Sequence, residues 1–252
     1  TVWRAKKEQA GGMPLDAGVH NADMLLYLMG PVSSVYAETS IFEPHRTLMP
    51  MNEVAPSLAA MYDHRREEGY LSGDDVEQTA VDTAFGVIRF ESGAIGQLGM
   101  TDTSHGQSLG VSTISGSEGT LYRSQSRSGQ SPRIIRNDGT EVTGDALLNL
   151  VPDFMLDKTT SILWDGERRI SSYDMDFRLI DSKILAYEYI DMVQAVESGG
   201  QPEVGPEEGI QALALAYALV ESGVKGESIT LQDVADGLVS FYQDEINTQM
   251  GI

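Results

Sequence analysis

The stretch GGMPLDAGVHNAD, residues 11–23, is the most informative part of this chain. It opens on a glycine pair and then places an acid, Asp16, four residues before a histidine, His20. Residues four apart share a helix face, so the Asp16 carboxylate can hold one ring nitrogen of His20 while the other nitrogen meets a substrate proton. This spacing indicates acid–base chemistry. Asp23 lies near the same face, and we interpret it as a packing or surface acid.

A helix is predicted over Asp16–Met29, because apolar residues recur there at spacings of three and four and Gly30 ends the pattern. A strand is predicted to follow over Val32–Phe42. The next part, residues 44–73, has the composition of an irregular insertion, with a short helix expected over Ser57–Glu68.

From Val76 onward the apolar period changes from helical spacing to alternation. The alternation in residues 81–88 and 94–101 surrounds a Glu91-Ser92-Gly93 turn, which is typical of a hairpin. Further strands are predicted over residues 109–115, 120–124, 133–136 and 141–143. Together these strands predict an antiparallel meander.

Helices dominate the last third of the sequence. Residues 144–176 are interpreted as a long excursion of the kind that covers a site. Helices are then predicted over Asp181–Ser198, Pro206–Ser222 and Leu231–Thr248, the second apolar nearly all round as a buried helix is. The expected fold class is α+β, with an open-faced, predominantly antiparallel sheet and helices on one face.

Composition excludes several classes of protein. The 252 residues, 41% of them apolar, are sufficient for a substantial core but contain no uninterrupted apolar run of the about 18 residues that a membrane span needs. A net charge of −21 repels phosphate backbones, so nucleic acid is not an expected partner. Zero cysteines exclude thiolate chemistry and fit a reducing compartment, and we expect a soluble, cytoplasmic protein. The acidity suits a salt-adapted source or an ordinary acidic enzyme, and these stay open.

Four stretches, in the same order, resemble the C-terminal domain of the Gfo/Idh/MocA oxidoreductases. They are residues 11–37 (GGMPLDAGVHNADMLLYLMGPVSSVYA), 76–98 (VEQTAVDTAFGVIRFESGAIGQL), 114–121 (ISGSEGTL) and 199–231. The resemblance implies that residues 1–252 form the substrate-binding and dimerisation domain of an NAD(P)-dependent sugar, polyol or cyclitol dehydrogenase or reductase. It also implies the open-faced sheet predicted above.

The resemblance assigns roles to particular residues. It implies that His20 is the general acid/base and that Asp16 supports it or binds substrate, whereas the alternative for His20 is a structural histidine facing the sheet. Arg4 and Trp3 stand where the family often has a residue beside the substrate, although an ordinary surface arginine is an equal alternative. His105 is a further candidate for substrate binding, with a solvated loop histidine as its alternative.

The cofactor site expected of this family does not occur in the sequence. No strand, Gly-x-Gly-x-x-Gly turn and helix follow one another to seat a pyrophosphate, and the family's Glu-Lys-Pro is also missing. We therefore expect that the Rossmann domain lies upstream, that NAD or NADP binds to the complete protein, and that this chain alone binds neither tightly. No metal site is expected, because His45 and His64 have no acid at ligand spacing.

Two functions remain open from the sequence. In the first, the chain is the substrate-binding part of a dehydrogenase that transfers hydride between a sugar, polyol or related cyclic alcohol and nicotinamide, and it forms a homodimer or homotetramer through its sheet face. In the second, it is a stand-alone binding or assembly module without redox activity. A Gly-rich strand–turn–helix encoded upstream would separate the two.

Overall fold

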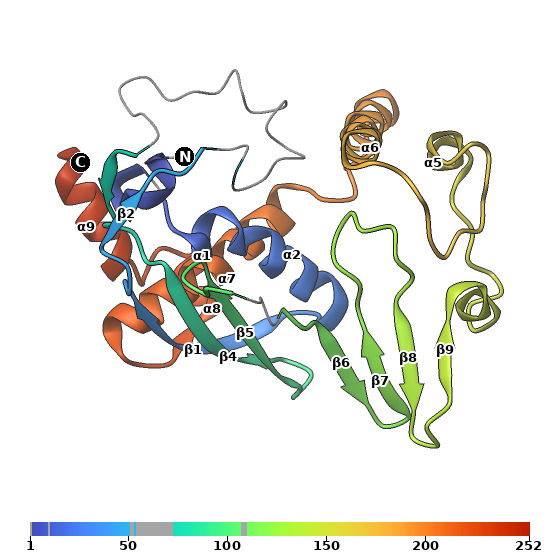
Figure 1. The fold of residues 1–252 in the computed structure, drawn as a ribbon, viewed down its shortest axis with the longest axis horizontal. Coiled ribbons are helices and arrows are strands. Elements are labelled where there is room, and N and C mark those ends of the chain that lie inside the picture. The colour runs from blue at the N-terminus through green and yellow to red at the C-terminus, as the bar shows by residue number, and fades with distance from the viewer. Residues whose placement is uncertain (1, 10, 51–52, 54–72, 107–109) are drawn as a thin grey trace. The chain divides into compact units, whose positions relative to one another are not determined.

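The computed structural model describes residues 2–9, 11–50, 53, 73–106 and 110–252. The chain divides into two compact units, of which unit 1 comprises residues 1–106 and 204–252 and unit 2 comprises residues 107–203. Both units combine helices with antiparallel sheets (Figure 1), which confirms the α+β class.

The main sheet of unit 1 has the strand order β10-β1-β4-β5, and all neighbours are antiparallel. Its strands are β1 (Val32–Ser40), β4 (Thr83–Phe90), β5 (Ile95–Thr101) and the short β10 (Ile229–Thr230). The β4–β5 hairpin turns where the sequence predicted it. In β1 and β4 the register pairs Tyr36 with Val87 and Glu38 with Phe85.

Two helices, α2 (Gly18–Met29) and α7 (Pro206–Lys225), cover one face of this sheet (Figure 1). Burial alternates along β4, so Ala84 and Ile88 lie inside while Phe85 and Val87 are exposed. The core between sheet and helices includes Leu215 and Leu219 of α7, both fully buried. The prediction that this helix is buried on most sides is confirmed.

Shorter elements complete unit 1. They are η1 (Val2–Ala5), η2 (Lys7–Gln9), α1 (Met13–Asp16), β2 (His45–Thr47), β3 (Asp75–Glu77), α8 (Leu231–Ala235) and α9 (Phe241–Met250). Strands β2 and β3 pair with each other and form a separate two-stranded sheet.

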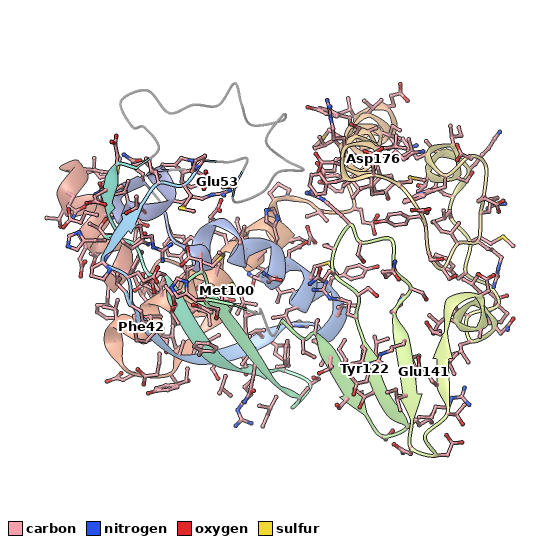
Figure 2. The ribbon with its side chains drawn as sticks, in the orientation of Figure 1. Phe42, Glu53, Met100, Tyr122, Glu141 and Asp176 are labelled. Carbon is pink, nitrogen blue, oxygen red and sulfur yellow. The ribbon has the colours of Figure 1, made fainter. Side chains whose placement is uncertain are left out.

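Unit 2 contains a four-stranded meander followed by helices. Its strands, in the spatial order β6-β7-β8-β9, are β6 (Thr113–Gly116), β7 (Gly119–Tyr122), β8 (Arg133–Arg136) and β9 (Glu141–Thr143). The helical segments are η3 (Gly144–Asn149), α5 (Lys158–Leu163) and α6 (Phe177–Ser198). Asp176, labelled in Figure 2, caps α6 by accepting a hydrogen bond from the Leu179 amide at 3.0 Å.

Some sequence predictions are wrong in detail. The strands form a meander only within unit 2, because β4 and β5 pair into the sheet of unit 1 instead of joining β6. The single helix predicted over 231–248 is two helices, because the chain turns at Gly237 (φ 70°) and Leu238 closes the end of α8 by donating to the Asp233 carbonyl. The helix predicted over Ser57–Glu68 lies outside the described residues, as does His64. In the described part, no helix is long and apolar enough to cross a membrane.

A buried carboxylate fastens α9 to the central helix. Glu221 of α7 is fully buried, and its two oxygens accept hydrogen bonds from the backbone amides of Tyr242 at 2.9 Å and Gln243 at 3.3 Å. Burial raises the pKa of the Glu221 carboxyl, while these amide donors favour its charged form. Glu221 is therefore one of the side chains that hold the C-terminal helix on the core, together with the buried Tyr242 and Ile246.

Replacing Glu221 with alanine should lower the free energy of unfolding by about 2–4 kcal/mol, because the buried amides of Tyr242 and Gln243 would lose their acceptor. Chemical denaturation of both proteins measures this loss. The matched control is Glu227→Ala, which removes an exposed partner of Lys225 and should change stability by less than about 1 kcal/mol. Equal effects of the two substitutions would contradict the role given to Glu221.

Candidate functional site

The glycine pair at 11 and 12 shapes the segment that carries the predicted site. A Cβ atom on Gly11 would lie 2.5 Å from the carbonyl oxygens of Trp3 and Lys6, and Gly12 has a positive φ of 98°. The Gly12 amide donates to the Arg4 carbonyl at 2.7 Å. The chain can therefore wrap closely around η1 only because both positions lack a side chain.

This turn brings Arg4 to Asp16. The Nε atom of Arg4 lies 2.7 Å from Oδ2 of Asp16, the last residue of α1. The Asp16 side chain is 22% exposed and that of Arg4 is 56% exposed, so the pair lies at the surface with its carboxylate mostly covered. The Arg4 guanidinium carbon also lies 5.3 Å from the ring centroid of Trp3, which is itself partly exposed. Three of the predicted site residues thus lie together.

His20 is exposed in the first turn of α2. This turn lies against β5, because a Cβ on Gly18 would come within 2.8 Å of the Met100 side chain (Figure 2 labels Met100). The helix predicted from Asp16 is divided at Ala17 into α1 and α2. Within the described residues the His20 side chain has no hydrogen bond or ion pair, and Asp16 pairs with Arg4 and not with His20. Asp23 is half-buried on α2.

His105 lies just beyond β5, in contact with a carboxylate that sequence reasoning did not identify. Its Nε2 forms a short contact with Oε1 of Glu43, which lies between β1 and β2. The side chain of His105 is otherwise largely exposed. The structure therefore places His105 in unit 1 but in a second polar group, with Glu43 as its partner.

The centre of this second group is Arg46 on β2. Its Nη1 and Nη2 atoms donate to the two oxygens of Asp102 at 2.8 and 2.7 Å, and Nη2 also lies 3.4 Å from the fully buried Asp82. The pairing with Asp102 raises the pKa of the Arg46 guanidinium above its ordinary value. Asp82 in turn accepts the amides of Phe42 and Glu43 at 2.9 and 3.0 Å. No spacing in the sequence predicted these contacts, because they join residues that lie 36 to 62 positions apart.

Among the residues that the structure describes, no group of three or more His, Asp or Glu side chains is arranged to hold a metal ion. His45, on β2, is exposed. The side chains gathered around Arg4 and Asp16 instead offer one acceptor, one set of guanidinium donors and an aromatic face, which are the groups that bind a hydroxylated ring.

A protein family and several known proteins are similar to this chain. A family model described as the oxidoreductase family, C-terminal alpha/beta domain, of Gfo/Idh/MocA type, matches residues 1–231. The chain is 26% identical over 235 residues to levoglucosan dehydrogenase of Pseudarthrobacter phenanthrenivorans, covering 92% of this chain and 55% of that protein. It is 27% identical over 232 residues to myo-inositol 2-dehydrogenase of Thermotoga maritima, covering 89% and 51% respectively.

The fold is also similar to that of solved structures. A levoglucosan dehydrogenase structure in complex with NADH and L-sorbose matches with a TM-score of 0.63 at 23% identity, covering 93% of this chain and 55% of that one. At this identity the likeness concerns the fold alone. The chain spans about half the length of the curated relatives it matches.

Substituting Gly11 with alanine should lower the free energy of unfolding by about 1–3 kcal/mol, since the new methyl group would press on three backbone carbonyls within 2.7 Å. Thermal melting measures the loss. The control is Gly209→Ala in α7, where a Cβ would meet nothing within 4 Å and helix propensity should raise the melting temperature. A Gly11→Ala protein as stable as Gly209→Ala would refute the close packing of the turn.

Proposed function

Because the chain belongs to the Gfo/Idh/MocA oxidoreductase family, represented here by the C-terminal alpha/beta domain of that family, we propose that it binds the substrate of an NAD(P)-dependent dehydrogenase. The proposed substrate is a sugar, a polyol or a related cyclic alcohol. Two curated relatives support this class, since one is named for levoglucosan and the other for myo-inositol. The observation that carries the proposal is the family match over residues 1–231, which contains every candidate site residue.

The N-termini of the two longest helices in the described part of the chain do not suit the pyrophosphate of a dinucleotide. The longest helices, α6 and α7, begin with acids at or near the first turn, namely Asp176 and the pair Glu207 and Glu208. These carboxylates would repel a pyrophosphate, which binds at helix N-termini through free amides. We therefore propose that NAD or NADP is held by a separate Rossmann domain of the complete protein, and we assign no step of hydride transfer to the residues of this chain.

His20 is the proposed proton-transfer residue. Its ring is exposed, so it is available to a substrate hydroxyl, and a histidine is readily tuned for proton transfer near neutral pH. Asp16 is proposed to support it or to bind a second hydroxyl from its place four residues earlier. This role requires the Asp16 carboxylate, now paired with Arg4, to accept an additional contact; a carboxylate has lone pairs for several donors.

Arg4, Trp3 and His105 are the proposed substrate-binding residues. Arg4 and Trp3 are supported by their position beside Asp16, where the guanidinium and the indole face could contact hydroxyls and ring carbons. The case for His105 rests on its exposed ring, although its Nε2 is engaged with Glu43. A substrate hydroxyl bound there would compete with or bridge to that carboxylate.

His20→Ala, in the complete dehydrogenase, should lower turnover by on the order of a hundredfold or more, the usual contribution of a positioned acid/base group. Asp16→Asn should also lower turnover. Steady-state kinetics and melting temperature are measured on the same preparations, with the exposed His45→Ala as the control. A His20→Ala protein that is less stable but fully active would end the catalytic assignment.

The open face of the main sheet is the proposed contact with another copy of the chain, in a homodimer or homotetramer. Helices cover the opposite face, and the open face carries the exposed apolar side chains of Tyr36, Phe85, Val87 and Ile95. The Phe85 ring lies over Gly99 of the neighbouring strand, so an aromatic face covers the sheet surface there. An exposed apolar patch of this kind is typical of an interface.

Replacing Phe85 with aspartate should convert this oligomer into monomers, because a charge would be buried against an apolar partner face. Sedimentation velocity at high micromolar concentration in moderate salt measures the change. The control is Leu238→Asp, which places the same charge on an exposed leucine between α8 and α9, away from the sheet. A monomeric unmodified chain, or an unchanged oligomer after Phe85→Asp, would contradict this interface.

A further inference from the structure

A tightly packed backbone turn holds the surface ion pair between Arg4 and Asp16. Two glycines that exclude any side chain, one with a φ of 98°, hold the carbonyl side of η1 against the start of α1. The result is a single contact between side chains, the 2.7 Å pair of Arg4 Nε and Asp16 Oδ2. The local backbone is thus organised so that Arg4 meets this carboxylate.

We propose that Arg4 is a positioning residue for Asp16, which it holds in one orientation for the reaction at His20. This inference rests on the proposed function and adds a role for Arg4 beyond any contact with substrate. The spacing in the sequence gave Asp16 the part of orienting His20, and the inference adds Arg4 as the residue that holds Asp16.

Burial explains why Asp16 needs such a partner. Its side chain is about four-fifths covered, and a covered carboxylate without a counter-charge is costly. Among the residues that the structure describes, Arg4 is the ion-pair partner of Asp16. Without it the carboxylate would be free to rotate toward solvent.

The geometry requires an arginine. The contact uses Nε, on the side of the guanidinium, while the Trp3 ring lies 5.3 Å from the guanidinium carbon and limits where the planar group can rest. A lysine ammonium has no lateral donor and no planar face, so it cannot reproduce both contacts. Arg4→Lys should therefore behave like Arg4→Gln and not like the unmodified protein.

The test is a double-mutant cycle on turnover in the complete dehydrogenase, with Arg4→Gln, Asp16→Asn and the pair of substitutions together. We expect Arg4→Gln to lower kcat by on the order of tenfold, by nearly the same factor as Asp16→Asn, with the double variant no worse than the single ones. Residues that act as one unit give such non-additive losses. Arg178→Gln, which removes an equally positive and exposed side chain from α6, is the control and should leave kcat unchanged.

Two further readouts exclude a merely structural role. Guanidinium ion, at concentrations well below those that unfold proteins, should restore part of the kcat of Arg4→Ala but none of that of Asp16→Asn. In the NMR spectrum, the Nε–H signal of Arg4 should show slow exchange with water in the unmodified protein and lose that protection in Asp16→Asn.

The outcomes separate the two proposals. If Asp16→Asn lowers kcat and Arg4→Gln does not, or if their losses multiply in the double variant, Arg4 is not a positioning residue, while the proposed function stands. If both Asp16→Asn and His20→Ala are fully active, the proposed catalytic roles of His20 and Asp16 fail, and the role of Arg4 fails with them. A rise in KM alone for Arg4→Gln, with kcat unchanged, would make Arg4 a substrate contact and would also overturn the inference.

Discussion

The packing of unit 1 depends on helix α7, which lies at its centre. It packs against β1 and β4 on the sheet side and against α2, α8 and α9 on its other sides, with Leu215 and Leu219 fully buried. A helix buried on most sides can tolerate few polar groups, so the buried carboxylate of Glu221 is informative. The Glu221 carboxylate accepts hydrogen bonds from two backbone amides of α9, and these bonds help to fasten the C-terminal helix to the core.

The same unit holds the candidate site at its edge. The segment from η1 to α1 is fixed by hydrogen bonds from Thr79 and Ala80 to the Ala5 carbonyl, and by the close approach of Gly12 to the Val81 carbonyl. Because Val81 lies two residues before the start of the sheet strand β4, the turn that carries Arg4 and Asp16 is packed against the sheet. A site built in this way is held in position by the fold instead of by a flexible loop.

Charge acts differently at the two polar groups of unit 1. Around Arg46, one guanidinium meets the carboxylates of Asp82, Asp102 and Glu43, so local negative charge remains in excess even after pairing. Around Arg4, one guanidinium meets one carboxylate and the charges balance. A neutral hydroxylated ligand suits the Arg4–Asp16 pair better than the Arg46 cluster. Binding it at the balanced pair would not bury a net charge. This difference agrees with the sugar or polyol class proposed for the chain.

Local pattern in the sequence was enough to predict most helices and strands. The apolar spacing of α7 and the alternation of β4 and β5 are confirmed, because each pattern reflects burial of one element against a single core. The resemblance that pointed to the family is also confirmed, and it was carried by short motifs such as the glycine pair before Asp16. The roles of His20 and Asp16 stay proposals.

Only the tertiary structure decided which residues meet. The spacing of Asp16 and His20 predicted a pair, yet the fold brings Asp16 to Arg4, twelve residues earlier, because the glycine turn reverses the chain. Likewise, the pairing of Glu43 with His105 and the separation of β5 from β6 into different sheets depend on contacts between distant segments. The apolar spacing of a segment indicates which side of a helix or strand is buried. The partner of a polar side chain depends instead on how distant elements pack together, and no local pattern in a single sequence specifies that packing.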